Sequence, residues 1–230
     1  MRFRNVGEVK AWNDAMVAKY DLDRFHAHPS VFVRFVESRR VARVFALLGA
    51  RSGDRVLEVG CGAGHLLARL PAGRAVGIDL AESLLARTRA RLGGRATLAQ
   101  GDAGALPFAS GAFDRVYCSE VLEHLVDPAG AVAEIRRVLK PGGVAVLSVP
   151  NEGLINRLKA LLRGLGIWRL VMRGAAYDMP DRMDDEWHLH AFDLAALRAI
   201  VPPSLTVTRA VGVPARAFAL RWVIRCEARG

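Results

Sequence analysis

Short apolar runs alternate with amphipathic stretches through the middle of the chain. Five apolar runs predict buried strands, at residues 56–59, 74–79, 96–103, 113–118 and 144–149. Apolar residues at helical spacing predict helices before and between these strands, at residues 30–48, 63–70, 82–92 and 128–139. Strands that alternate with helices are typical of a parallel sheet with helices on both faces. The pattern therefore predicts the α/β class.

The pattern changes after Pro150. Six apolar residues fall on one face of a predicted helix, at Leu154, Ile155, Leu158, Leu161, Leu162 and Leu165. The opposite face carries Arg157, Lys159 and Arg163. Residues 151–187 interrupt the alternation of strands and helices, and we predict that they form a lid over the substrate.

The end of the chain differs again. A short helix is predicted at residues 193–201, where Asp193 can cap its first turn. Two β-rich runs follow, at residues 205–211 and 218–226, with turn-forming residues between them. These two runs predict an antiparallel hairpin.

Three glycines at alternate positions follow the first predicted strand, at Gly60, Gly62 and Gly64. Glycine adopts positive φ and lets a ligand approach the backbone closely, so this turn is a candidate ligand cradle. Its spacing is G-x-G-x-G, whereas a dinucleotide cradle has G-x-G-x-x-G. Glu58 precedes the loop, and its carboxylate would repel a diphosphate but accept hydrogen bonds from an ammonium. The cradle therefore fits a nucleoside that carries an amino acid better than a dinucleotide.

The next two strands also end in acids. Asp79 lies 19 residues after Gly60, close to the spacing at which an acid binds a ribose diol in folds of this type. Asp102 ends the third strand and is suited to an adenine amino group. Because ligands of open parallel sheets bind outside the carboxyl ends of the strands, we expect these acids and the glycine loop to form one site.

Five motifs in this order resemble the class I S-adenosylmethionine-dependent methyltransferases of the small-molecule type. They occupy residues 58–64 (EVGCGAG), 77–79 (GID), 101–108 (GDAGALPF), 113–124 (FDRVYCSEVLEH) and 137–143 (RVLKPGG). The resemblance covers roughly residues 41–150.

The resemblance implies a Rossmann-like, seven-stranded, mostly parallel sheet with helices on both faces and an antiparallel C-terminal hairpin. At 230 residues we expect one domain. Its parts would be an N-terminal cap (1–40), a cofactor-binding core (41–150), the substrate lid (151–187) and a C-terminal helix and hairpin (188–230).

The same resemblance implies S-adenosylmethionine as the cofactor and assigns its contacts. The glycine loop would cradle it, Glu58 would anchor the amino end of the methionine part, and Asp79 would bind the ribose. The full set of predicted cofactor-binding residues is Tyr20, Glu58, Gly60, Cys61, Gly62, Gly64, Asp79, Leu80, Asp102, Ala103 and Ser119. Tyr20 belongs to an N-terminal segment that often covers the cofactor in this family, although its aromatic residues could equally serve to fasten that segment to the domain.

Three histidines are candidate catalytic residues. His124 follows the fourth strand near the predicted methyl group, and imidazole suits a general base for a hydroxyl acceptor. The Leu-Glu-His run around His124 is also often structural in the family. His188 and His190 lie where the predicted lid returns to the sheet, and they could act as bases or contact the substrate. No third metal ligand is evident, so no metal site is predicted.

Composition limits the alternatives. The formal charge is +10, with 29 arginines against four lysines, which fits either a nucleic-acid partner or a coding bias. The chain has no run of 18 apolar residues and no apolar signal core, so a cytoplasmic location is expected. The three scattered cysteines are expected to be reduced thiols.

We therefore predict an enzyme that methylates a small amphipathic or anionic acceptor, as in secondary metabolism, with oxygen favoured as the acceptor atom. One alternative is an RNA methyltransferase, but no RNA-binding domain is appended, and the Asn-Pro-Pro-aromatic run of many nucleic-acid amino-methylases is absent. Others are a lipid or quinone methyltransferase whose residues 154–173 lie on an anionic membrane, and a non-catalytic cofactor-binding module. The oligomeric state is left open. The glycine spacing argues against a nicotinamide oxidoreductase.

Overall fold

The computed structural model describes residues 6–19, 30–70, 74–168 and 187–229. Tyr20 lies outside the described residues, and so do residues 169–186 of the predicted lid.

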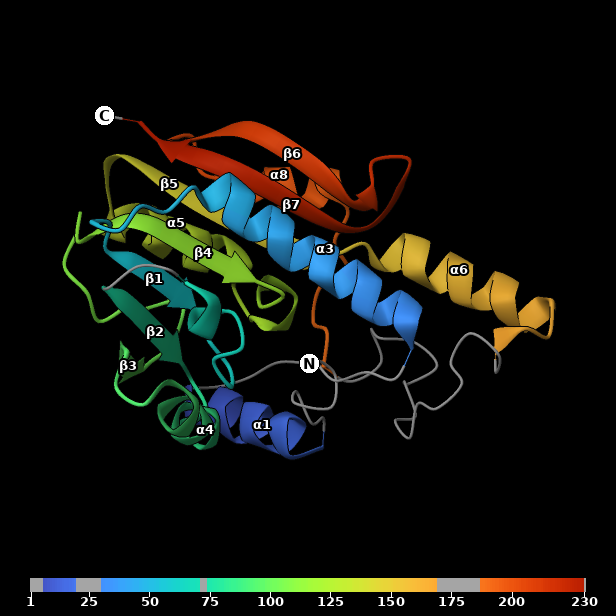
Figure 1. Ribbon diagram of the computed structural model, residues 1–230, viewed down its shortest axis with the longest axis horizontal. Helices are drawn as coiled ribbons and strands as arrows, with labels where there is room; N and C mark the ends of the chain where they lie inside the picture. Colours follow the sequence, from blue (N-terminus) through green and yellow to red (C-terminus); the bar gives the residue numbers. More distant parts are fainter. Residues whose placement is uncertain (1–5, 20–29, 71–73, 169–186, 230) are drawn as a thin grey trace.

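The seven strands form one sheet in the order β3-β2-β1-β4-β5-β7-β6 (Figure 1). They are β1 (Val56–Val59), β2 (Ala75–Asp79), β3 (Ala96–Gln100), β4 (Phe113–Ser119), β5 (Leu139–Pro150), β6 (Leu205–Ala215) and β7 (Phe218–Ala228). The first five strands run parallel, and β7 pairs antiparallel with both β5 and β6. The predicted fold class, including the reversed C-terminal hairpin, is confirmed.

Six α-helices are described: α1 (Val6–Lys19), α3 (Val31–Leu48), α4 (Glu82–Leu92), α5 (Pro128–Val138), α6 (Glu152–Gly164) and α8 (Leu194–Ala199). Helices α3 and α4 end at the residues predicted, and in both cases a glycine follows, because Gly49 and Gly93 adopt the left-handed conformation at the C-caps. Asp193 caps α8 as predicted, accepting a hydrogen bond from the Ala196 N–H.

Two hydrophobic clusters cover opposite faces of the sheet. Helix α3 crosses one face, and α5 lies behind the other (Figure 1). Val56 belongs to the cluster under α3, whereas its neighbour Leu57 belongs to the cluster under α5. This alternation follows from the period of two along a strand. It explains why the central strands are apolar on both faces.

The segment after the glycine loop differs from the prediction. A helix was predicted at residues 63–70, but the structure has only the short 3-10 turn η1 (Leu67–Arg69). Gly60, Gly62 and Gly64 have φ values of 72°, 52° and 75°, which do not belong to a right-handed helix. A helix can therefore start only after Gly64, and six residues then remain before Pro71. The positive φ values of the three glycines are as expected for the turn, whereas the α-helix predicted at residues 63–70 is wrong.

Helix α6 projects away from the body of the molecule (Figure 1). The predicted apolar face packs on the body in the first turns, where Ile155 is buried and Leu154 and Leu158 are partly buried against the cluster under α3. Farther along, Leu161 and Leu165 of the same face are 58% and 62% exposed. Lys159, which was predicted on the polar face, is instead buried at 4% exposure. No described helix is long and apolar enough to cross a membrane.

Candidate functional site

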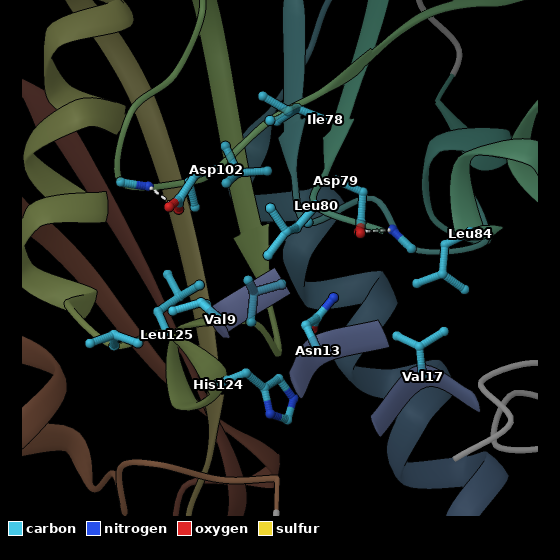
Figure 2. Close-up of a pocket in the computed structure, with 18 of the residues that line it drawn as sticks. Val9, Asn13, Val17, Ile78, Asp79, Leu80, Leu84, Asp102, His124 and Leu125 are labelled. Atoms are coloured by element: carbon cyan, nitrogen blue, oxygen red, sulfur yellow. Dashed lines mark hydrogen bonds between the residues drawn. The ribbon is translucent and has the colours of Figure 1, made fainter. Parts of the chain in front are cut away.

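A cavity of about 420 Å³ opens at the carboxyl ends of the parallel strands. Its walls come from the ends of β1 and β2, from the loops after β3 and β4, from α1 and from Trp187. In Figure 2, Asp79 and Asp102 lie on one side and His124 on the other, with Asn13 and Val17 of α1 nearby. Helix α1 therefore closes part of the cavity that the strand ends define.

The glycine loop leaves no room for larger side chains. A Cβ at Gly60 would lie 2.4 Å from Val121 Cγ2, and one at Gly64 would lie 2.6 Å from Thr88 Cγ2. The Gly60 N–H donates to the Ile78 carbonyl at 2.8 Å, and the Thr88 hydroxyl donates to the Gly62 carbonyl at 2.7 Å. The loop is thus fixed to β2 and α4, and its backbone faces the cavity at Gly60 and Gly62.

Asp79 holds the same loop from the end of β2. Its carboxylate accepts hydrogen bonds from Gly62 N at 2.8 Å and Ala81 N at 2.9 Å. Burial raises the pKa of Asp79, and these backbone N–H groups oppose the shift. Each oxygen keeps a lone pair that could accept a hydrogen bond from a diol.

The third strand end carries Asp102, which accepts from Gly104 N at 2.9 Å and lines the cavity with Ala103. Two residues of α5 hold the loop that follows. Glu134 accepts from Leu106 N at 2.8 Å, and Arg137 donates to the Leu106 carbonyl at 2.9 Å. Hydrogen bonds from α5 therefore fix the backbone of the loop beside the predicted adenine position.

Glu58 lies on β1 just before the cavity-lining Val59 and Gly60 and does not itself line the cavity. Burial raises the pKa of Glu58 to about 8, although the Tyr117 hydroxyl and the Arg40 charge act to lower it. Its Oε2 atom is buried and has no hydrogen-bond partner among the described residues. An ammonium group at the loop would supply the missing partner, so this site fits the methionine end of the predicted cofactor.

Three other residues predicted to bind the cofactor do not line the cavity, namely Gly64, Cys61 and Ser119. Cys61 is buried, and its Sγ would lie 2.9 Å from a Cβ at Gly77. Ser119 accepts a hydrogen bond from Arg40 and is 2.8 Å from the Ser148 hydroxyl. Leu80 lines the cavity (Figure 2), and its contact with the cofactor stays a prediction.

A polar network that the sequence did not reveal lies below the end of β4. Arg40 of α3 pairs with Glu37 and donates to Ser119. Burial acts to lower the pKa of Arg40, but the charge of Glu37 and its hydrogen bond outweigh burial and leave that pKa raised. Arg221 of β7 pairs with Glu120 at 2.6 Å. Arg40 is 79 residues from Ser119 and Arg221 is 101 residues from Glu120, so sequence spacing gave no signal for these two contacts.

His124 lines the cavity on the side opposite Asp102 (Figure 2). Its Nδ1 is 3.1 Å from the Trp187 carbonyl, and its ring packs on the Trp187 ring with centroids 4.6 Å apart. A carbonyl oxygen only accepts, so Nδ1 carries the hydrogen and Nε2 keeps a lone pair. Burial and the neighbouring His188 lower the pKa of His124 to about 3. His124 is therefore a neutral hydrogen-bond acceptor at ordinary pH.

His188 and His190 do not line the cavity. The Nδ1 atom of His188 is 2.5 Å from Glu152 Oε1, and its ring lies 4.8 Å from that of His124. The ring of His190 instead lies 6.2 Å from that of Phe192. Of these two candidate catalytic histidines, the structure places His188, and not His190, next to His124.

Glu123 is a further residue that sequence reasoning missed. Its carbonyl accepts hydrogen bonds from the backbone N–H groups of residues 189 and 190, which fastens that segment next to His124. Burial raises the pKa of the Glu123 carboxyl well above its usual value. Atoms of Glu123, His124 and His188 that can act as ligands lie within 4.8 Å of one another. Among the described residues, these three groups form the set that could accommodate a cation. The sequence analysis considered the histidines but did not identify Glu123 as a third ligand.

Comparisons with known proteins agree with this geometry. A family model described as a methyltransferase domain matches residues 57–147. A ubiquinone biosynthesis O-methyltransferase of Methylococcus capsulatus is 36% identical over 213 residues, which cover 85% of each chain. A probable S-adenosylmethionine-dependent methyltransferase of Mycolicibacterium smegmatis is 41% identical over 118 residues. Apart from the Methylococcus protein, the chain spans only about a third to three fifths of the length of the similar curated proteins.

Solved structures with the same fold include the putative methyltransferase from Haloferax volcanii, in complex with the Trm112 methyltransferase activator. Its TM-score is 0.68 at 19% identity, covering 96% of this chain and 98% of that chain. A possible histamine N-methyltransferase of Thermotoga maritima has a TM-score of 0.66 at 17% identity, covering 96% and 100%. At these identities the structures bear on the fold alone.

The chain belongs to the class I S-adenosylmethionine-dependent methyltransferases. S-Adenosylmethionine, the cofactor of this family, supplies an activated methyl group on a sulfonium. The sterically closed glycine loop, the Asp79 carboxylate and the orphaned oxygen of Glu58 fit this cofactor.

Proposed function

We propose that the enzyme transfers a methyl group to the hydroxyl oxygen of a small, neutral, amphipathic aromatic acceptor. The observation that carries the proposal is that His124 lines the cavity opposite the ends of β2 and β3, while its Nδ1 is engaged by the Trp187 carbonyl and its Nε2 keeps a lone pair. The relative from Methylococcus capsulatus, whose name describes an O-methyltransferase of ubiquinone biosynthesis, supports oxygen as the acceptor atom.

In this proposal each side of the cavity has its own task. Asp79 binds the ribose diol, Asp102 binds the adenine edge, and the loop at Gly60 and Gly62 lies against the methionine part. The sulfonium methyl would then face the side of the cavity where Glu120 and His124 lie.

The acceptor hydroxyl would donate its hydrogen bond to His124 Nε2, and its proton would leave through this contact to solvent as the methyl–oxygen bond forms and the methyl–sulfur bond breaks. Because His124 is a weak base, its main contribution would be to help orient the oxygen toward the methyl carbon. Holding both reactants in line, of which this contact is one part, can lower a barrier by about 7–11 kcal/mol. Trp187, packed on His124, would help to exclude water.

The net charge of the cavity favours a neutral acceptor. Its described lining contains the carboxylates Asp79, Asp102, Glu120 and Asp127 but no lysine or arginine. An anionic acceptor was considered because the lid sequence is basic, yet a carboxylate entering this cavity would meet like charges. We therefore keep the amphipathic part of that prediction and give up the anionic part.

A methyl-transfer assay with labelled S-adenosylmethionine tests the proposal. The panel would contain 4-methylcatechol, a phenol, a primary aromatic amine and bulk RNA. We expect transfer to the hydroxylated rings, with the label released by conditions that cleave aryl methyl ethers. Transfer to the amine or to RNA alone would contradict the proposal.

A second proposal concerns α6 and the surface of an anionic membrane. Leu161, Leu165 and Ile167 are exposed near the end of the projecting helix, and Arg157 and Arg163 lie on the same helix. An apolar tip with basic neighbours is typical of a peripheral contact with anionic lipid. Such a contact would give the cavity access to acceptors that carry an apolar tail.

Co-sedimentation with phosphatidylglycerol vesicles at low salt tests this contact. The double variant Leu161→Glu/Leu165→Glu should lose binding, whereas Arg209→Glu on β6 lowers the net charge by the same two units and should retain it. If wild-type protein stays in the supernatant, or if the two variants behave alike, the proposal is wrong.

A further inference from the structure

Glu120 has an unusual backbone conformation at the edge of the cavity. Among the described residues it is the only one other than glycine with a left-handed φ, at 57°. A side chain with a Cβ is disfavoured in that region. Strain of this kind persists where the surrounding structure holds it, and it concentrates at functional sites.

The surroundings hold the Glu120 side chain in one orientation. Its Oε1 accepts from the Ser148 hydroxyl at 2.9 Å, and its Oε2 pairs with Arg221 Nε at 2.6 Å. Ser148 is itself fully buried and bonded to Ser119, which accepts from Arg40. The network therefore connects residues of α3, β4, β5 and β7 to one carboxylate.

The Glu120 carboxylate lies on the part of the cavity wall that we assign to the acceptor. Glu120 lines the cavity directly after β4, on the same segment as His124. Its side chain keeps 21% of its surface exposed, so it is not sealed off by its partners. Each of its oxygens has a second lone pair that could accept a hydrogen bond.

We propose that Glu120 is a specificity-determining residue, which accepts a hydrogen bond from a second hydroxyl on the acceptor ring and rejects acceptors that carry a carboxylate. The inference rests on the proposed O-methylation. It goes further by naming the residue that selects the acceptor and the charge that this residue excludes.

Electrostatics explains why a fixed carboxylate would select in this way. A mobile carboxylate could turn away from an anionic ring substituent. Glu120 is held by Ser148 and Arg221, so an anion beside it loses hydration without gaining a partner. A neutral hydroxyl, in contrast, brings the donor that a carboxylate binds well.

The test compares two ring probes of similar size, neutral 4-methylcatechol and anionic 3,4-dihydroxybenzoate. The wild-type enzyme should have the higher kcat/KM for 4-methylcatechol. Glu120→Gln keeps the side-chain shape, and we expect it to reduce the ratio of the two kcat/KM values about tenfold. Ser148→Ala, which frees Oε1, should reduce the ratio by a smaller factor.

The matched control is Glu82→Gln, which makes the same change of charge in an exposed pair on α4. It should leave the ratio unchanged. The affinity of each variant for S-adenosylhomocysteine, measured by calorimetry, should stay within about threefold of wild type, because Glu120 is assigned to the acceptor and not to the cofactor.

Four results would overturn the inference, and they are distinguishable. An unchanged ratio in Glu120→Gln removes the selective role. A large loss of S-adenosylhomocysteine affinity in that variant assigns Glu120 to the cofactor. Loss of transfer with a chelator, restored by Mg²⁺, would place a cation between Glu120 and the acceptor. Wild-type protein that binds S-adenosylhomocysteine but methylates neither catechol overturns the proposed function, and this inference with it.

Discussion

The two halves of the cavity are built in different ways. On the cofactor side, three consecutive strands end at one edge, and the contacts are backbone groups and two aspartates close to them in sequence. On the acceptor side, Glu120 and His124 depend on side chains and carbonyls from distant elements, such as Arg221 and Trp187. The first half follows from local sequence, whereas the second is assembled by the completed fold.

This difference explains which changes each half tolerates. The glycine loop has no adaptable side chain, so steric changes there act directly on the ligand cradle. The acceptor wall consists of charged and polar groups held by long-range partners, so charge changes there should alter selectivity before they alter the fold. The predictions below test the two halves separately.

The largest effect is expected at the glycine loop. Gly60→Ala would place a Cβ 2.4 Å from Val121 Cγ2 at a φ of 72°. We expect it to lower the free energy of unfolding by roughly 2–4 kcal/mol and to abolish S-adenosylhomocysteine binding in calorimetry.

Gly49→Ala is the matched control, because Gly49 also has a left-handed φ but no atom within 4 Å of the added Cβ. It should lower the free energy of unfolding by only about 1 kcal/mol and leave binding unchanged. If both variants lost the same amount of binding affinity, the loss would come from backbone strain at a positive φ and not from steric closure of the glycine loop.

A pH dependence is expected from Glu58. Its pKa of about 8 in the free protein lies above the ordinary carboxyl value. The stability that this protonated group contributes is fully present below pH 4.5 and is lost as pH rises from about 4.5 through about 8. A bound ammonium favours the carboxylate, so binding releases a proton below pH 8.

The affinity for S-adenosylhomocysteine should therefore increase between pH 6 and pH 8, by up to about tenfold per pH unit. Glu58→Gln should flatten this dependence in calorimetric titrations. A slope that is the same in Glu58→Gln and wild type would assign the proton to another group.

The acceptor half should show a weaker pH dependence. His124 has its pKa lowered to about 3, so it stays neutral from pH 5 to pH 8. His124→Gln should lower kcat for 4-methylcatechol about tenfold, less than a strong general base would contribute. The dependence of kcat on pH should have the same shape in wild type and in His124→Gln. If wild type has an inflection near pH 6.5 that the variant lacks, His124 is a titrating base.

The smallest effect concerns the backbone at Glu120. Glu120→Ala and Glu120→Gly both remove the carboxylate, so their difference reports the strain at a φ of 57°. Glycine should be the more stable variant by about 1 kcal/mol, or roughly 2–4 °C in Tm. If alanine is as stable as glycine, Glu120 is not strained and the functional argument from its conformation fails.

The same contrast describes what the sequence could predict. Apolar periodicity was sufficient for the α/β alternation, and the glycine caps were sufficient for the ends of α3 and α4. Asp79 and Asp102 could be placed because parallel strands end at one edge of the sheet. The helix predicted at residues 63–70 was wrong because the left-handed glycines extend the turn through Gly64, and only the short 3-10 turn η1 follows.

The acceptor side could be predicted only in outline. His124 was named, but its tautomer depends on the Trp187 carbonyl, 63 residues away. Nothing local marks the left-handed Glu120 or its pairing with Arg221. Lys159 was placed on the polar face by periodicity, and its burial has no local signal in the sequence.

Calorimetric titration of S-adenosylhomocysteine into the wild-type chain, Gly60→Ala and Gly49→Ala tests the central claim most directly. The account predicts one ligand per chain for wild type and Gly49→Ala, and no measurable binding for Gly60→Ala. Absence of heat with folded wild-type protein, or wild-type affinity in Gly60→Ala, would contradict the assignment of this cavity to the cofactor.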